Sequence, residues 1–363
     1  LILKNKTNWI RGYYVTPEDT INGKVTYSIY FEDECYGDEV YQVTGPGKPD
    51  NPSYGIISVD SIRYVNTQMN DFYNTNEQGD YVIITHKDFY EKALELVEHK
   101  RAIGFKSVIY KLERIYDEYN YSNESPYAIK AFLTDAYTTW HTLPRYVLFI
   151  GDVGTENSLP SIKYQSAGAR GAILTESWFV DIDDDFVMEM ALGRLPINKE
   201  SELDSIIVKI KAFDLIEIPS QKINRIALLA GPQPVFKDQM QDYINNISPD
   251  YIQADRLYLY DSHLTGDFDA GIHATDTLVE FINDGIFCLN YLGHGGGYTW
   301  DNYVLPYSAF DEFKSVNPFI VNSLTCFTNT FSNDNALGEM FIRHPRGGIS
   351  VMSSTGYGWL NSN

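Results

Sequence analysis

The stretch Ile286-Phe-Cys-Leu-Asn-Tyr-Leu-Gly-His294-Gly295 and the later stretch Phe319-Ile-Val-Asn-Ser-Leu-Thr-Cys326 decide the fold. Each is a short apolar run that ends near a residue with acid–base or nucleophilic chemistry. Runs of this length and composition predict strands buried in a parallel sheet. In open α/β sheets, the ligand crevice lies beyond the carboxyl ends of such strands. We therefore expect one imidazole and one thiol to meet where such folds place their sites.

From residue 79 onward, predicted strands alternate with predicted helices. Tyr81-Val-Ile-Ile-Thr85 is an apolar run of strand length, an amphipathic helical pattern follows it, and the alternation restarts near residue 220. This rhythm predicts an α/β fold with mostly parallel sheets flanked by helices. The expected organisation is a small β-rich N-terminal region followed by two α/β sub-domains, the second of which carries the His and Cys strands: residues 1–78, 79–218 and 219–363.

The composition excludes several classes of protein. The chain has 363 residues and a formal net charge of −21, with 49 acidic against 28 basic residues. Binding to nucleic acid depends on positive charge, so no nucleic-acid partner is expected. No stretch reaches the roughly 18 consecutive apolar residues of a membrane-spanning segment. The chain begins at Leu1 without a signal-peptide pattern, and we expect it to be a processed piece.

The three cysteines, Cys35, Cys288 and Cys326, are too few for a disulfide framework, and their spacing does not predict a zinc site. Cys288 lies inside its apolar run and is expected to be an ordinary buried residue. Cys326 ends its run, and a reactive thiolate needs a neighbouring imidazolium or amide dipoles. His294 is the best partner for it among seven histidines.

His294 taken alone is explained equally well as a satisfied histidine in a tight glycine-rich turn. Gly293 and Gly295 surround it, and glycines let the backbone approach a ligand closely. The arrival of both chemical types at equivalent strand ends favours a Cys–His dyad and a thiol hydrolase.

These residues resemble the gingipain family of cysteine endopeptidases, which belongs to the caspase-like clan. The resemblance rests on His294-Gly295 with Trp300 after it, and on Cys326 with Phe331 after it. Further segments that are similar to this family extend the resemblance to about residues 79–363: Tyr81-Val-Ile-Ile-Thr-His, Pro126-Tyr-Ala-Ile-Lys130, Tyr146-Val-Leu-Phe-Ile-Gly-Asp152, Ala191-Leu-Gly-Arg-Leu-Pro196 and Ser353-Ser-Thr-Gly-Tyr-Gly-Trp359.

The resemblance implies a mechanism without a required cofactor. Cys326 would attack the scissile carbonyl and form a thioester acyl-enzyme, and His294 would protonate the leaving amine. The backbone N–H groups of Gly295 and Cys326 would form the oxyanion hole. Glu176 is the candidate acid that orients the histidine, although a solvated loop carboxylate explains it as well. In place of a glycine that is usual three residues after the nucleophile, this chain has Asn329.

The resemblance also implies substrate and metal contacts. Asp185 matches an aspartate at the floor of the S1 pocket in Arg-specific members, which favours a basic P1 residue. Trp359 matches a wall of that pocket, and Trp300 is assigned to the same substrate-binding set. Asp181 and Asp183 suit oxygen ligation of a structural Ca²⁺, so the acids of this segment have two candidate uses.

Three functions remain open from the sequence. The first is a secreted or cell-surface endopeptidase that acts on protein or peptide substrates and matures from a zymogen with its own propeptide. The second is a sortase-like transpeptidase on the same scaffold. The third is a non-catalytic binding module, which would have no need for a thiol at this strand end.

Overall fold

The computed structural model describes residues 77–120, 122–155, 157–164, 173–216, 224–259, 270–330 and 335–358, together with the backbone of five earlier strands. These earlier strands pair in an antiparallel manner in two small sheets: β1 (Ile2–Asn5), β2 (Asn8–Trp9) and β5 (Tyr41–Thr44) in one, and β3 (Tyr14–Ile21) and β4 (Lys24–Tyr30) in the other. The predicted boundary near residue 218 lies outside the described residues.

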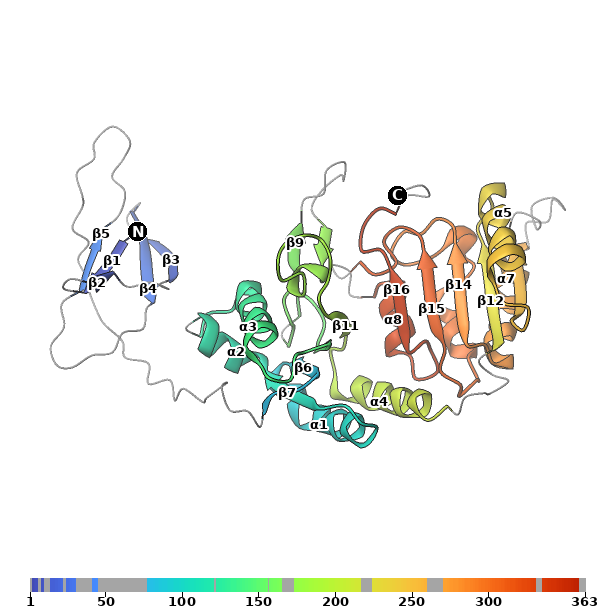
Figure 1. The fold of residues 1–363 in the computed structure, drawn as a ribbon. Coiled ribbons are helices and arrows are strands. Elements are labelled where there is room, and N and C mark those ends of the chain that lie inside the picture. The colour runs from blue at the N-terminus through green and yellow to red at the C-terminus, as the bar shows by residue number, and fades with distance from the viewer. Residues whose placement is uncertain are drawn as a thin grey trace.

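The first large sheet has four parallel strands in the order β11-β8-β6-β7 (Figure 1). Successive residues of its central strand point to opposite faces, because Val82 and Ile84 pack in one core cluster and Ile83 packs in another. Helices α2 and α3 cover the first face, and α1 and α4 cover the second. The elements are β6 (Tyr81–Thr85), α1 (Lys87–Ala102), β7 (Ser107–Lys111), α2 (Leu112–Asn120), α3 (Pro126–Thr139), β8 (Tyr146–Ile150), β11 (Ala191–Leu195) and α4 (Glu200–Asp214).

The second large sheet has five parallel strands in the order β13-β12-β14-β15-β16. Helices α7 and α8 pack on one face, and α5 packs on the other face over β12. The elements are β12 (Arg225–Ala230), α5 (Pro234–Asp242), β13 (Gln253–Tyr258), α7 (Ala270–Asp284), β14 (Cys288–Leu292), β15 (Ile320–Leu324), α8 (Leu337–Arg343) and β16 (Ser350–Ser353).

These two sheets confirm the predicted α/β fold with mostly parallel strands. Two features were not predicted. Helix α2 follows β7 without a break, and a short antiparallel hairpin of β9 (Ile162–Tyr164) and β10 (Ile173–Thr175) projects from the first sheet. Short helical turns complete the described part of the chain: 3₁₀ turns at Ser177–Phe179, Asp301–Tyr303 and Tyr307–Glu312, and a π-helical turn at Tyr243–Ile247.

Helices α4 and α8 join the two sheets. In Figure 1, α4 runs from the first sheet toward the second, where α8 lies against β16. Lys209 of α4 is buried, and its Nζ donates hydrogen bonds to backbone carbonyl groups at the end of α8 and in the turn after it: Phe341 O at 3.3 Å, Ile342 O at 2.6 Å, His344 O at 2.9 Å and Gly348 O at 2.9 Å. Lys209 thus satisfies the carbonyls of Phe341 and Ile342, which the end of the helix leaves without partners.

A buried charge cluster lies at the same junction. Arg343 of α8 pairs with Asp152, which follows β8 of the first sheet, and its guanidinium lies 3.3 Å from Glu339 one turn earlier. The side chains of Asp152 and Glu339 are each only 2% exposed. Burial and then the negative charge of Asp152 raise the pKa of Glu339 to about 8, although Arg343 opposes this effect. Burial of Tyr307, and then the nearby charges of Tyr298 and Glu339, raise the pKa of its hydroxyl group.

This shift predicts how stability depends on pH. Because the pKa of Glu339 rises on folding from 4.5 to about 8, the folded chain holds an extra proton between these values. Its contribution is therefore fully present at low pH and is lost as pH rises toward 8. Glu339→Gln should remove this dependence. Between pH 5 and 8, the free energy of unfolding of the variant should fall less than that of the wild type, and the difference should be up to about 4 kcal/mol.

Urea unfolding at several pH values measures this effect. Glu98→Gln, at an exposed position of α1, is the matched control and should keep the wild-type dependence. An unchanged pH dependence in Glu339→Gln would contradict the prediction.

Candidate active site

The register of two neighbouring strands brings His294 and Cys326 to the same edge of the second sheet. Strands β14 and β15 are parallel, and Leu292 pairs with Leu324. His294 and Cys326 each lie two residues beyond this pair. The loops that follow therefore leave the sheet side by side, which is where open α/β sheets form their ligand crevice.

The two loops are in close contact at Gly295. A Cβ atom at this position would lie 2.8 Å from Cys326 O and 2.8 Å from Thr325 Oγ1. Neither atom can move easily, because one belongs to the backbone and the other to a buried side chain. Glycine is therefore required for the observed approach of the His294 loop to the Cys326 loop.

The main chain of His294 is fixed by two residues that the sequence did not indicate. Asp301 Oδ2 accepts the N–H of His294 at 2.8 Å, and the hydroxyl of Tyr291 lies 2.8 Å from His294 O. The same hydroxyl lies 3.0 Å from Asp301 Oδ2. This network closes the loop between His294 and Asp301 without using the imidazole ring.

The imidazole of His294 is exposed and contacts the loop that follows β12. Its Nε2 lies 2.9 Å from Nε2 of Gln233, and its ring packs edge-on against Phe236 with 5.2 Å between centroids. Gln233 was not predicted as a site residue, although its place just after the apolar strand β12 was a usable signal.

Cys326 is half-buried in a turn with an unusual backbone. Its Sγ lies 3.4 Å from the N–H nitrogen of Gly358, and the next residue, Phe327, has a φ of 58°. Such a left-handed conformation is uncommon for a bulky residue and is held here by a hydrogen bond from Phe327 N to Gly356 O at 2.9 Å. Burial raises the pKa of Cys288 to about 11, which keeps that thiol protonated.

Asn329, which stands where the resemblance leads us to expect a glycine, contacts both β16 and α8. Its Nδ2 donates to Val351 O of β16 at 3.3 Å, and its Oδ1 fills the space beside Gly338 at the start of α8. A Cβ at Gly338 would come within 1.8 Å of that oxygen. The asparagine therefore ties the Cys326 loop to β16 and α8.

Two backbone donors are available at the site. Across the described residues, the N–H groups of Gly295 and Cys326 donate to no protein acceptor, whereas their neighbours Gly296 and Phe327 bond to Thr299 O and Gly356 O. Both free N–H groups belong to the loops that Gly295 brings into contact. An oxyanion hole needs uncommitted donors beside the nucleophile, so both N–H groups are candidates for that role.

Trp300 lies in the core rather than on a substrate surface. It is 1% exposed and stacks on Tyr291 with 4.3 Å between centroids. Its Nε1 donates to Ser323 Oγ at 2.9 Å. A ring this deeply buried cannot touch a substrate. The expected substrate contact is therefore not present in this arrangement, and Trp300 instead packs beneath the His294 loop against Tyr291.

Glu176 is committed to an ion pair in the first sheet. Both of its carboxylate oxygens accept hydrogen bonds from Arg194 Nη2 at 3.0 Å, and Arg194 is 2% exposed. The preceding strand β10 reaches the site, because a Cβ at Gly356 would lie 2.8 Å from Ile173. Within the described residues, however, Glu176 forms no hydrogen bond or ion pair with His294.

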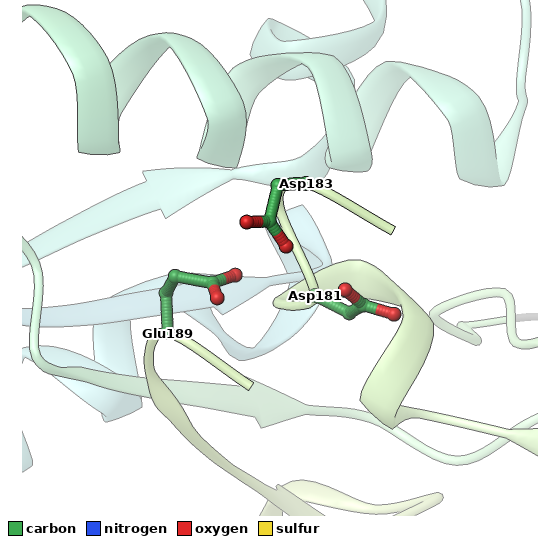
Figure 2. Close-up of side chains that lie close together, drawn as sticks. All are labelled: Asp181, Asp183 and Glu189. Atoms are coloured by element: carbon green, nitrogen blue, oxygen red, sulfur yellow. The ribbon is translucent and has the colours of Figure 1, made fainter. Parts of the chain in front are cut away.

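The predicted metal ligands Asp181 and Asp183 gather with Glu189, and all three offer carboxylate oxygens within 4.8 Å of one another. Figure 2 shows the carboxylates of Asp183 and Glu189 turned toward each other. Desolvation and then the negative charges of Asp185 and Glu189 raise the pKa of Asp183. Asp181 also accepts the N–H groups of Asp185 and Phe186, at 3.0 and 3.2 Å.

Asp185 and Trp359 are the two remaining substrate-binding candidates. Asp185 is exposed, and its Oδ1 accepts the N–H of Val187 at 2.8 Å. Trp359 lies outside the described residues.

Comparison with known proteins identifies the family. The model of peptidase family C25 matches residues 74–363. The chain belongs to peptidase family C25. The expected resemblance to gingipains is thereby confirmed. Lys-gingipain W83 of Porphyromonas gingivalis is 22% identical over 293 residues, which cover 77% of this chain but only 16% of that protein. An uncharacterized protein of Archaeoglobus fulgidus is 22% identical over 329 residues, 77% of this chain and 76% of that protein.

Solved structures share the fold. The Arg-specific cysteine proteinase gingipain R superimposes with a TM-score of 0.59 at 17% identity, covering 78% of this chain and 64% of that one. A structure described as a protease gives a TM-score of 0.61 at 20% identity, covering 81% and 62%. Among the helices of the described residues, none combines the length and apolar character needed to cross a membrane.

The contact at Gly295 predicts a sharp difference between neighbouring glycines of this C25 chain. Gly295→Ala should lower the free energy of unfolding by about 1–3 kcal/mol, because the new methyl group overpacks the Cys326 loop. Gly296→Ala meets nothing within 4 Å and should change it by less than about 0.5 kcal/mol. Urea unfolding of both variants measures the difference, and equal effects would show that the two loops do not touch.

Proposed function

We propose that this chain is a cysteine endopeptidase in which Cys326 is the nucleophile and His294 the acid–base group. The observation that carries the proposal is the register of β14 and β15, which places both residues two positions beyond paired strand ends. The contact of Gly295 with Cys326 O brings their loops together. The membership of family C25 supports a peptidase rather than another thiol chemistry.

The proposed reaction follows from these positions. His294 takes the proton of the Cys326 thiol, and Sγ attacks the carbonyl carbon of the scissile bond. The C–N bond breaks as His294 gives the proton to the leaving amine, which leaves a thioester on Cys326. Water then gives a proton to His294 as its oxygen attacks the thioester carbonyl carbon, and the C–S bond breaks to release the carboxylic acid, which ionises in solvent. His294 returns its proton to Sγ of Cys326.

The N–H groups of Gly295 and Cys326 are the proposed donors to the negative oxygen of each tetrahedral intermediate. Their lack of protein acceptors in the described part of the chain supports this role. A donor that meets charge only as it develops lowers the barrier by roughly 3–4 kcal/mol.

A basic P1 residue is the proposed preference. The relatives include a Lys-gingipain and an Arg-specific gingipain R. In this chain the exposed carboxylate of Asp185 is the candidate group that pairs with the P1 cation. A protein or peptide is the proposed substrate, and maturation from a longer secreted or cell-surface precursor is part of the same proposal. For gingipain RgpB, a complex of the pro- and mature domains has been solved.

A fluorogenic peptide panel with Arg, Lys, Asp or Leu at P1 tests this function. We expect turnover after Arg or Lys that Cys326→Ala abolishes and Cys288→Ala retains. Turnover after another residue would keep the dyad and discard Asp185 as the S1 group. An added amine nucleophile that diverts the product would favour a transpeptidase, and silence toward both the panel and a thiol-reactive peptide would favour a binding module.

A structural Ca²⁺ in the cluster of Asp181, Asp183 and Glu189 is also proposed. The donors fit the ion, because Ca²⁺ prefers carboxylate oxygens and the three carboxylates lie within 4.8 Å of one another. Three carboxylates supply only part of the six to eight ligands that Ca²⁺ takes, so backbone carbonyls or water would complete the shell.

Thermal unfolding with Ca²⁺ or with a chelator tests this site. Ca²⁺ at about a hundred times its Kd should stabilise the chain by about 2.7 kcal/mol. Asp183→Asn should remove most of this gain. Asp184→Asn is the control, since that carboxylate pairs with Lys130 at 3.1 Å instead of joining the cluster. The same gain in both variants would exclude this cluster.

A further inference from the structure

The loop after β12 presents Gln233 to the active site from a stiff backbone. Gln233 lies between Pro232 and Pro234, and the second proline opens α5. Its φ of −84° and ψ of 137° are the extended values that a following proline favours. The two prolines restrict the backbone on both sides of Gln233, so the position from which its side chain extends is well defined.

The same loop is locked against the His294 loop. Gly231 N donates to Leu292 O at 2.8 Å. A Cβ at Gly231 would lie 3.1 Å from the Cα of Gly293 and 2.4 Å from Asp301 Oδ2. The strand order places β12 on the side of β14 that faces away from β15, so Gln233 approaches His294 from the side opposite the Cys326 strand.

The imidazole has one polar side-chain partner in the described part of the chain, and this partner is Gln233. Their Nε2 atoms lie 2.9 Å apart. Phe236, three residues later in α5 and 2% exposed, packs edge-on against the same ring. One polar and one apolar contact from a single helix turn thus define where the ring lies.

We propose that Gln233 is the positioning residue of His294, an inference that rests on the proposed dyad. A terminal amide offers an oxygen or an NH₂ group to a partner through rotation by 180°. As observed, the NH₂ group of Gln233 faces Nε2 of His294 and donates to it, which holds the ring proton on Nδ1. Rotation of the amide by 180° lets Oε1 accept Nε2–H instead, so the orientation of this one side chain selects the tautomer of the ring. Glu176, the acid expected from the sequence, is the competing assignment, but Arg194 binds both of its oxygens.

A neutral amide has a consequence that a carboxylate does not. It fixes the tautomer and orientation of the imidazole without adding a negative charge that favours imidazolium. The pH profile of the enzyme should therefore respond to the charge at position 233 and not to the charge at position 176.

The experiment compares Gln233→Met, Gln233→Glu and Glu176→Gln. Gln233→Met keeps the length but removes the hydrogen bond, and kcat should fall roughly ten- to hundredfold with KM nearly unchanged. Gln233→Glu adds a charge near the ring, and the limb of the kcat/KM profile that reports His294 should move up by about one pH unit. Gln239→Glu adds the same charge to an exposed position later in α5 and should leave the profile unchanged.

An NMR titration of ¹⁵N-labelled histidine gives a second measurement that needs no turnover. The His294 signal is assigned by its loss in His294→Phe. We expect Gln233→Glu to move the midpoint of this signal to higher pH and Gln233→Met to change the ratio of its two tautomers. A purely structural role for Gln233 would change thermal stability and leave both observations as in the wild type.

The outcomes separate the two proposals. If the peptide panel is silent but the NMR signal responds to Gln233, the positioning role stands and the peptidase proposal fails. If Cys326→Ala abolishes turnover but both Gln233 variants keep the wild-type profile and signal, the positioning role is overturned. A limb shift in Glu176→Gln alone would also overturn it and assign the role to Glu176.

Discussion

The parallel pairing of β14 with β15 is the constraint on which the site depends. Because Leu292 pairs with Leu324, His294 and Cys326 each lie two residues beyond the same paired position at the edge of the sheet. Side chains alternate between faces along a strand, so a slip of one residue would turn one strand's buried set outward and place the two groups at different heights. Burial of Leu289, Tyr291 and Val321 on the face that α7 and α8 cover therefore fixes the register of the two strands.

Helix α8 connects the His294 and Cys326 loops to the first sheet. Its first residues receive both loops, because Leu337 N donates to Gly297 O at 2.7 Å and Gly338 N donates to Thr328 O at 3.0 Å. Its C-terminal end contacts the first half of the fold. Arg343 pairs with Asp152 after β8, and Ile342 O accepts a hydrogen bond from the buried Lys209 of α4. The first sheet thus supports the site mechanically, although the proposed nucleophile and base both come from the second.

Sequence analysis succeeded where structure depends on local pattern. The His and Cys strands were predictable because an apolar run ends at a polar or glycine-rich turn in each case. Helix α2 was missed because β7 passes into it without glycine or proline, yet Leu112, Ile115 and Tyr116 have helical spacing and are buried. For Trp300, the resemblance gave a position in a motif but not its burial, which depends on packing against Tyr291 and Phe341.

The partner of His294 could not be predicted for a different reason. It depends on which strand lies on the far side of β14, and the order β13-β12-β14-β15-β16 is a property of the whole sheet. Residues 233 and 294 meet only because the β12 loop crosses to Leu292. The position of Glu176 is also set by nonlocal contacts, because it pairs with Arg194 of β11. The proposed orienting group of His294 therefore depends on the strand order of the whole sheet, which the residues around His294 and Cys326 do not reveal.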